Sequence, residues 1–162
     1  MTSHLDVVFL DVGGPIYGDR PYYQALLAAI KEAAPDADED AFWAEFEACR
    51  RDQRGPFTDR LIRRLLPDGD ADGIKDRGRE LWSYPPEVLH PDVRPALGAL
   101  DGRYRLGILA NQERWVHNCL RRDGLDGFFE FWAVSAEVGV EKPDTASSST
   151  PSARPGRPRS DA

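Results

Sequence analysis

The sequence predicts an α/β fold in which a Rossmann-like parallel sheet is interrupted by an inserted helical bundle. Three observations lead to this prediction. An apolar run near the N-terminus is typical of a buried strand, a long middle segment has helical periodicity, and strand and helix patterns alternate again after Tyr84. This order favours parallel strands joined by helical crossovers. With 162 residues, 41% of them hydrophobic, the chain is long enough for one domain or for a small core with a lid.

The first predicted strand is Val7–Leu10, which leads directly into Asp11. Four consecutive apolar residues suit a strand that is buried on both faces, as in a parallel sheet. Gly13, Gly14 and Pro15 follow and end regular structure. Asp11 is a candidate catalytic carboxylate, because ligands of open parallel sheets bind at the carboxyl ends of strands. A strand that stops at a solvated turn explains this stretch equally well.

The segment from Pro21 to about Trp82 predicts three or four helices. Its apolar residues fall into three stripes with helical spacing, and turn signals separate the stripes. The stripes are Tyr23, Leu26, Leu27 and Ile30; Phe42, Trp43, Phe46 and Cys49; and Leu61, Ile62, Leu65 and Leu66.

Strand and helix patterns return after Tyr84-Pro85-Pro86. We expect, in order, a helix over Asp92–Leu100, a strand over Tyr104–Leu109, a helix over Glu113–Arg122 and a strand over Phe131–Ser135.

Two further candidate site residues follow the predicted strands. Asn111 comes after the second strand, where its amide could bind an oxyanion or a halide, although taken alone it fits a helix N-cap better. Lys142 precedes Pro143-Asp144 and could bring a cation to the site, although an exposed turn lysine is the commoner case.

Composition excludes several classes of function. The net charge of −7 argues against a nucleic-acid partner. No apolar stretch approaches the roughly 20 residues that span a bilayer, and no signal peptide is recognisable, so we expect no membrane association. The two cysteines, Cys49 and Cys119, form no disulfide framework and suit a reducing cytoplasm. The three histidines lack metal-ligand spacing.

The composition changes at Thr145. From there to Ala162 the chain is rich in serine, proline and arginine and has no large apolar side chain. Such a segment cannot bury enough surface to offset the entropy of ordering, so we expect residues 145–162 to be disordered.

Together these stretches resemble the haloacid dehalogenase (HAD) superfamily of hydrolases. The resemblance rests on the order of a strand ending in Asp11, a helical insertion, Y-P-P-E-V-L-H-P-D-V-R-P-A-L-G-A-L, a strand ending in Asn111, and S-A-E-V-G-V-E-K-P-D. It covers roughly residues 7–144. It implies an incomplete HAD-like core over residues 1–18 and 84–144, with a helical-bundle cap over residues 19–83.

The resemblance implies a role for each matching position. Asp11 would be the nucleophile that attacks phosphorus, or a halogen-bearing carbon, and forms a covalent intermediate. The Asp11 carboxylate and the Gly13 carbonyl would hold a Mg²⁺ ion. Gly14, Ala110 and Asn111 would then lie around a small-molecule substrate.

Two positions depart from the family's usual pattern. Gly13 stands where the family's phosphatases carry a second Asp that protonates the leaving group, so acid help worth about 10²–10⁴ in rate should be absent. Ala110 stands in place of a Ser or Thr of the second motif, which removes a hydroxyl donor. Lys142 matches the lysine of the third motif, which balances negative charge at the reaction centre.

The family's fourth motif, whose acids complete the metal site, has no counterpart after Lys142. We hypothesise that the chain is C-terminally truncated or frameshifted. GC-rich codons chosen for Thr145–Ser152, read two bases later, can encode R-V-F-L-D-A-L, which has the expected helical pattern. Without the following strand, Val7–Asp11 should form an unpaired apolar edge of the sheet.

The leading hypothesis is a cytoplasmic HAD-type hydrolase that acts on a small phosphorylated metabolite with Mg²⁺ as cofactor and is impaired in this chain. One alternative is a haloacid dehalogenase-like hydrolase of carbon–halogen bonds, favoured by Gly13 and Asn111. The other is a catalytically inactive HAD-like fragment, favoured by Gly13, Ala110 and the missing fourth motif.

Overall fold

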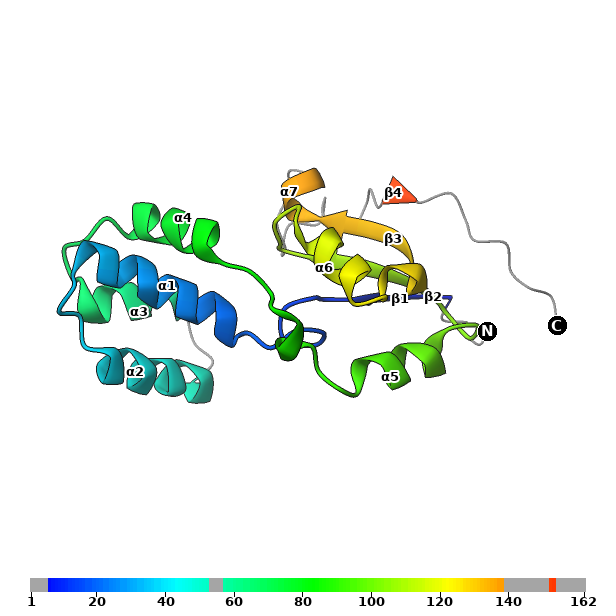
Figure 1. Ribbon diagram of the computed structural model, residues 1–162, viewed down its shortest axis with the longest axis horizontal. Helices are drawn as coiled ribbons and strands as arrows, with labels where there is room; N and C mark the ends of the chain where they lie inside the picture. Colours follow the sequence, from blue (N-terminus) through cyan, green and yellow to red (C-terminus); the bar gives the residue numbers. More distant parts are fainter. Residues whose placement is uncertain (1–5, 53–56, 139–151, 154–162) are drawn as a thin grey trace. The chain divides into compact units, whose positions relative to one another are not determined.

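The computed structural model describes residues 6–52, 57–138 and 152–153 (Figure 1). It divides into two compact units, and the chain crosses between them twice. Unit 1 consists of Met1–Gly18 together with Tyr84–Ala162, and unit 2 consists of Asp19–Ser83. Unit 2 is therefore an insertion between the first strand of unit 1 and the rest of that unit.

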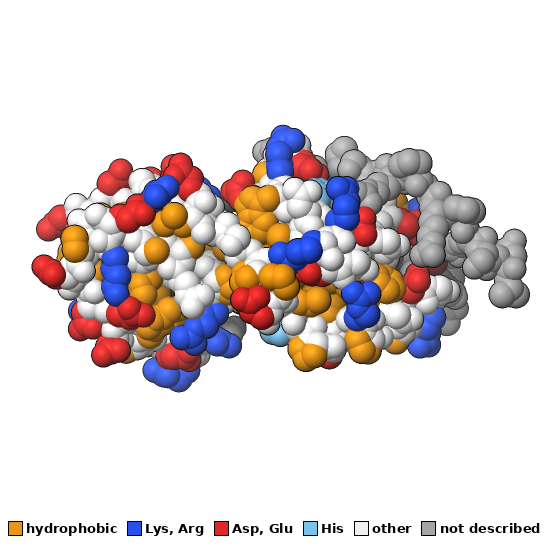
Figure 2. Space-filling model, viewed as in Figure 1, with side chains coloured by type: hydrophobic (Ala, Val, Ile, Leu, Met, Phe, Trp, Pro, Cys, Tyr) orange, Lys and Arg blue, Asp and Glu red, His pale blue; other side chains and the backbone are white. Residues whose placement is uncertain are grey.

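Unit 2 contains four helices in its described residues, in agreement with the periodicity of the sequence. They are α1 (Arg20–Ala33), α2 (Glu39–Asp52), α3 (Phe57–Leu65) and α4 (Ala71–Leu81). The three apolar stripes meet in one core, whose fully buried members include Leu26, Ile30, Phe42, Leu61 and Ile62. Charged side chains of both signs lie on the visible face of these helices (Figure 2), as the amphipathic pattern of each helix predicts.

Unit 1 is built on a parallel sheet, which confirms the predicted fold class. Strands β1 (Val7–Leu10), β2 (Arg105–Ala110) and β3 (Phe129–Val134) are parallel and adjacent in that order. The connections contain η1 (Pro86–Val88), α5 (Val93–Leu100), α6 (Val116–Arg122) and η2 (Asp126–Phe128), and α7 (Ser135–Val138) follows β3.

Two predicted elements differ from the observed ones by more than one residue at an end. The third strand begins at Phe129 rather than Phe131, and Ser135 begins α7 instead of ending the strand. At this end of the strand, the Ser135 hydroxyl accepts a hydrogen bond at 3.1 Å from the backbone amide of Gln112, which lies in the loop after β2. Helix α6 begins at Val116, after a turn in which Val116 N donates to the Glu113 carbonyl at 3.1 Å.

Helices α5 and α6 lie on one face of the sheet. Arg94 of α5 donates to the carbonyls of Asp123 and Gly124 at the end of α6, so the two helices are neighbours. The His117 ring of α6 lies 4.3 Å from the Trp132 ring of β3, which identifies the covered face. Right-handed crossovers between consecutive parallel strands require this arrangement.

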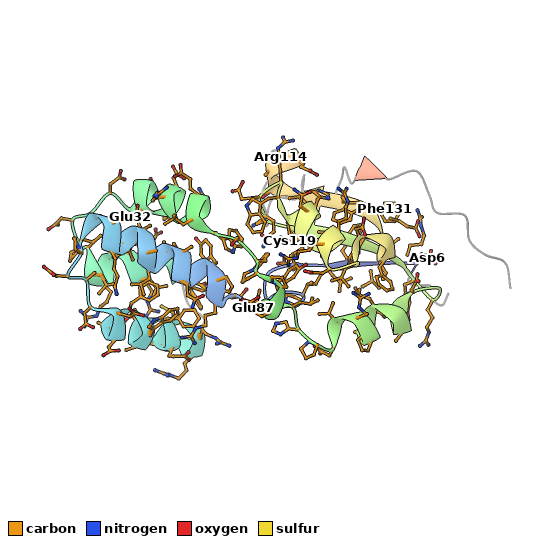
Figure 3. The ribbon with its side chains drawn as sticks, viewed as in Figure 1. Asp6, Glu32, Glu87, Arg114, Cys119 and Phe131 are labelled. Carbon is orange, nitrogen blue, oxygen red and sulfur yellow. The ribbon has the colours of Figure 1, made fainter. Side chains whose placement is uncertain are left out.

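The opposite face carries an aromatic pair. Phe9 is 43% exposed, and its ring centre lies 6.2 Å from that of Phe131, which Figure 3 labels. Gly107 lies between them on β2, where an added Cβ would come within 2.5 Å of the Phe9 ring. The glycine therefore lets the Phe9 ring lie across the neighbouring strand.

The two edges of the sheet are different. Strand β1 is an edge strand of the described sheet, as the sequence analysis expected. At the other edge, β4 (Ser152–Ala153) pairs antiparallel with β3. The expectation of disorder after Thr145 does not hold for these two residues, because β3 offers them an unpaired edge. The rest of that segment lies outside the described residues.

Candidate active site

Asp11 lies at the carboxyl end of β1, in a tight loop. One carboxylate oxygen, Oδ1, accepts a hydrogen bond from the Val12 amide at 2.8 Å. The Val12 carbonyl in turn accepts from the amides of Ile16 and Tyr17 at 3.1 and 3.0 Å. These bonds close the loop and fix the direction in which the Asp11 side chain leaves the backbone.

Gly14 makes the turn of this loop possible. Its φ is +87°, a backbone conformation that residues other than glycine rarely adopt. Its amide donates to the Tyr17 carbonyl at 2.8 Å, and its carbonyl lies 3.0 Å from Nε2 of His90. Both backbone groups of Gly14 are therefore engaged within the protein, which favours a structural role in the turn over direct contact with a substrate.

The segment that follows Tyr84 holds the loop in place. In addition to its ring contact with Gly14, His90 donates its backbone amide to the Ile16 carbonyl at 3.1 Å. Gly18 N donates to the Val88 carbonyl at 2.9 Å. His90 was not among the residues selected from the sequence, where it was one of three scattered histidines, because only the folded chain brings it to Gly14.

Ala110 and Asn111 lie at the carboxyl end of the neighbouring strand, β2. Leu10 pairs with Ile108, so the carboxyl ends of β1 and β2 lie side by side. Ala110 is 1% exposed and pairs with Val134, whereas Asn111 is exposed. Asn111 and Asp11 thus follow the carboxyl ends of two adjacent parallel strands. Lys142, the third predicted site residue, lies outside the described residues.

Gln112 joins the ends of β2 and β3 and was missed by the sequence analysis. Its backbone carbonyl accepts a hydrogen bond from the Ala136 amide at 3.3 Å, and its backbone amide donates to Ser135 Oγ at 3.1 Å. The side chain is only 7% exposed and donates to the Tyr84 hydroxyl at 3.2 Å. Within the described part of the chain, the Gln112 Oε1 atom has no hydrogen-bond partner. In the sequence, its position directly after Asn111 was the only sign that Gln112 could take part in the site.

Tyr84 and Tyr17 stack at the root of the insertion, and both are almost fully buried. Their ring centres are 4.6 Å apart. The Tyr84 carbonyl accepts from Arg122 of α6 at 2.9 Å, and the thiol of Cys119, labelled in Figure 3, lies 3.9 Å from it. The two chain crossings are thus fixed to one another within unit 1.

Tyr17 also takes part in a partly buried charged network. Its hydroxyl donates to Asp123 at 2.7 Å, and Arg122 forms an ion pair with the same carboxylate at 2.7 Å. Burial, strengthened by this hydrogen bond, raises the pKa of Tyr17 well above its usual value. The hydrogen bond from Arg122, followed by that from Tyr17, lowers the pKa of Asp123. At neutral pH the phenol is therefore neutral and the carboxylate is charged.

The described residues do not by themselves fit a Mg²⁺ site. Among them, no group of three or more His, Cys, Asp or Glu residues is arranged to hold a metal ion. The Asp11 carboxylate and the backbone carbonyl of Gly13 are oxygen donors of the kind that Mg²⁺ prefers, but Mg²⁺ requires near-octahedral coordination. Asp11 and Gly13 alone would leave most of that coordination to other groups.

No protein-family model matches the sequence, and no curated protein matches it either. In the described part of the chain, no helix combines the length and apolarity needed to cross a membrane.

Solved structures, in contrast, share the fold. The chain is similar to the magnesium-bound HAD-hydrolase YfnB of Bacillus subtilis, with a TM-score of 0.63 and 17% identity over 90% of this chain and 70% of that one. It is similar to a subfamily IA HAD-superfamily hydrolase of Geobacter sulfurreducens PCA, with a TM-score of 0.57 and 21% identity over 88% and 68% of the two chains. A Thermotoga maritima protein described as a β-phosphoglucomutase gives a TM-score of 0.53 and 22% identity over 86% and 66%.

Proposed function

We propose that this chain, which has the fold of the HAD-superfamily hydrolases, hydrolyses a small phosphorylated metabolite through the Asp11 carboxylate. The observation that carries the proposal is the position of Asp11. It lies at the carboxyl end of β1, in a loop closed by backbone hydrogen bonds, with Asn111 at the end of the adjacent parallel strand. Open parallel sheets bind their ligands at the carboxyl ends of their strands.

Asp11 is suited to nucleophilic attack because its orientation is set before the substrate arrives. The Val12 amide holds Oδ1 at 2.8 Å, and the loop is tied to His90. In the proposed reaction a carboxylate oxygen of Asp11 forms a bond to phosphorus, and the bond from phosphorus to the ester oxygen breaks, so the alcohol leaves as an alkoxide that takes its proton from water. Water then cleaves the acyl phosphate, which releases inorganic phosphate and restores the carboxylate.

The other proposed residues act on charge and space. Asn111 can donate its side-chain amide to a phosphoryl oxygen, and Lys142 is proposed to balance the negative charge that Asp11 and phosphate bring together. Gly13 has no side chain to protonate the leaving alcohol, so substrates with good leaving groups should react fastest. The buried free cysteines Cys49 and Cys119 support a reducing, cytoplasmic location.

Gly13 also favours a second candidate, the hydrolysis of a carbon–halogen bond. Here a carboxylate oxygen of Asp11 forms a bond to carbon and a halide ion leaves with the electron pair. Water then cleaves the resulting ester, which releases the alcohol and restores the carboxylate. The halide needs no proton, so the absence of an acid at position 13 costs nothing in this reaction. Asn111 can donate its amide to the departing halide.

The test compares phosphate release from a panel of phosphate monoesters with chloride release from 2-chloropropionate, each with and without Mg²⁺. Asp11→Asn should lower whichever activity is present by about 10³-fold or more, because an amide is a poor nucleophile. Asp6→Asn is the matched control, since Asp6 precedes the same strand and is exposed; it should retain activity.

Phosphate release that depends on Asp11 would support the first candidate, and chloride release the second. A wild-type chain that is folded but releases neither product would contradict both and would support the inactive alternative. Equal activity of wild-type and Asp11→Asn protein would contradict the assigned nucleophile.

A further inference from the structure

Unit 2 carries two arginines that lie against one pair of aromatic rings. The Arg20 guanidinium of α1 lies 4.6 Å from the centre of the Trp43 ring, and that of Arg50 lies 5.6 Å from the Phe46 ring. The Trp43 and Phe46 rings are 5.5 Å apart and nearly perpendicular. Two cations therefore border a single aromatic pair on α2.

Further rings extend this pair. The Tyr23 ring lies 4.6 Å from Phe46, and Tyr22 lies 5.2 Å from Tyr23 and 5.0 Å from Trp82. All of these rings except Phe46 are partly exposed. We call the set the Arg–aromatic cluster, and it consists of Arg20, Tyr22, Tyr23, Trp43, Phe46, Arg50 and Trp82.

The two arginines of the cluster have no carboxylate partner among the described residues. Several other cations of unit 2 are paired, at 2.6 to 2.8 Å: Lys31 with Glu39, Arg60 with Glu45, Lys75 with Asp59, and Arg77 with Glu32. Arg20 and Arg50, in contrast, are exposed, and their described contacts are with ring faces. Their positive charge is therefore not balanced by an ion pair within the described part of the unit.

A guanidinium in a cation–π contact still has N–H donors to offer to a ligand. A guanidinium that lies on a ring uses its flat face, while its five N–H donors point outward in the plane, in a fork that matches a carboxylate or a phosphate. The neighbouring rings offer apolar faces on which the body of a ligand can lie. The cluster thus combines anion donors with an aromatic platform.

Acidic groups also lie near the cluster. Glu39 accepts from the Trp43 indole N–H at 3.3 Å and is itself paired with Lys31. Asp19 is next to Arg20 in sequence. Burial, followed by the charge of Asp19, raises the pKa of Tyr23 to about 12, while Arg50 acts in the opposite direction. Tyr23 is therefore a neutral phenol at physiological pH and adds no negative charge.

We propose that the Arg–aromatic cluster binds a small molecule in which a phosphate or carboxylate group is attached to an aromatic or apolar body. Arg20 and Arg50 would hold the anionic group, and the rings around Trp43 would hold the body. The proposal goes beyond the proposed hydrolysis and does not require that Asp11 reacts.

The experiment titrates the full chain with phenyl phosphate and measures binding by calorimetry and by tryptophan fluorescence. We expect saturable binding with a Kd of about 1 mM or below. Inorganic phosphate carries only the anionic group and phenol only the aromatic body, so each should bind about tenfold more weakly. Trp43→Phe should retain the calorimetric binding but lose most of the fluorescence change, because a phenyl ring still supports Arg20.

A pair of double variants tests the assignment. Arg20→Gln with Arg50→Gln should raise the Kd about tenfold or more. Arg63→Gln with Arg64→Gln makes the same change of charge on α3, beside a separate groove of about 440 Å³ that Glu45 and Asp59 also line, and should leave the Kd within about twofold. Asp11→Asn should leave it unchanged as well, which separates this site from the proposed catalytic one.

The proposal would be overturned by no saturable binding up to about 10 mM, by equal weakening in the two double variants, or by loss of binding in Asp11→Asn. Circular dichroism checks that each variant is folded. If the Gln variant is unfolded, Arg20→Lys with Arg50→Lys replaces it. Lysine keeps the charge but lacks the planar fork, so binding should still weaken, and unchanged binding would count against the proposal.

Discussion

Unit 2 and unit 1 bury different kinds of side chain. The core of unit 2 is made of apolar residues from four helices, and its ion pairs lie at the surface, as that between Lys31 and Glu39 does. Unit 1 buries an apolar sheet face too, but beside it lies a polar network in which Tyr17 bonds to Asp123 and Gln112 bonds to Tyr84. One unit is held by its apolar pattern, and the other also depends on specific polar partners.

The difference is one of sequence distance. In unit 2, each helix contributes a stripe whose members are three or four residues apart, so a local pattern describes the buried surface. In unit 1, Tyr17 and Asp123 are 106 positions apart, and no local pattern announces that they will meet. The predictions below separate the two kinds of stabilisation, starting from the largest expected effect.

Phe42→Ala should be the most destabilising of these changes. Phe42 is fully buried in the core of unit 2, and truncation of a buried phenylalanine costs about 3–5 kcal/mol in the free energy of unfolding. Urea denaturation followed by tryptophan fluorescence measures the loss. A cost below about 1 kcal/mol would show that the core of unit 2 is not closely packed.

Tyr17→Phe should reduce the free energy of unfolding by about 1.5–3 kcal/mol, the range for hydrogen bonds to charged groups. The variant keeps the stack on Tyr84 and removes only the donor to Asp123. Urea denaturation at pH 7 provides the measurement, and Tyr104→Phe is the matched control because Tyr104 is only half-buried. An equal loss of unfolding free energy in both variants would show that the hydrogen bond from Tyr17 to Asp123 contributes no more than the Tyr104 hydroxyl does.

The contribution of Asp123 should depend on pH. Its pKa is lowered in the folded state, chiefly by Arg122, so its charge stabilises the fold above the ordinary value of 3.8 and this stabilisation is lost as the pH falls through the lowered pKa. The cost of Asp123→Asn should therefore be complete at pH 7 and decrease as the pH falls below about 4. Urea denaturation across this range measures it; a cost that is constant with pH would contradict the ion pair.

Two glycine substitutions should act in opposite directions. Gly107→Ala should cost about 1–3 kcal/mol, because the new Cβ would lie 2.5 Å from the Phe9 ring and 3.0 Å from Phe131 Cβ. Gly98→Ala lies in α5 with no atom within 4 Å of the new Cβ, and should stabilise by about 0.5–1 kcal/mol. Thermal midpoints compare the two, and a loss in both would contradict the assigned packing.

The smallest effect should come from the exposed ion pairs of unit 2. Glu32→Gln, which removes a partner of Arg77 on the surface, should leave the urea midpoint within experimental error, because solvent and salt screen such pairs. Repeating the measurement at 1 M salt should give the same small difference. A clear loss at low salt that disappears at high salt would show that the surface charges of unit 2 stabilise it more than its geometry indicates.

The candidate site shows where sequence reasoning ended. Asp11 and Asn111 were selected because each follows an apolar strand, and parallel pairing of β1 with β2 brings the two strand ends to one edge. His90 and Gln112 were not selected, although one contacts the loop of Gly14 and the other joins the ends of β2 and β3. Their roles depend on contacts between distant segments. The catalytic role of Asp11 stays a prediction.

The sequence by itself determined the helical character of unit 2, and in unit 1 the order of the three parallel strands and of the helices between them, because apolar periodicity records which side of each helix or strand is buried. It also determined the parallel sheet, since a strand–helix–strand order requires a crossover. Only the tertiary structure decided which polar groups become partners, such as Tyr17 with Asp123 and Gly14 with His90. The physical reason is that a buried hydrogen bond depends on exact distance and direction between residues far apart in the chain, and periodicity carries no information about either.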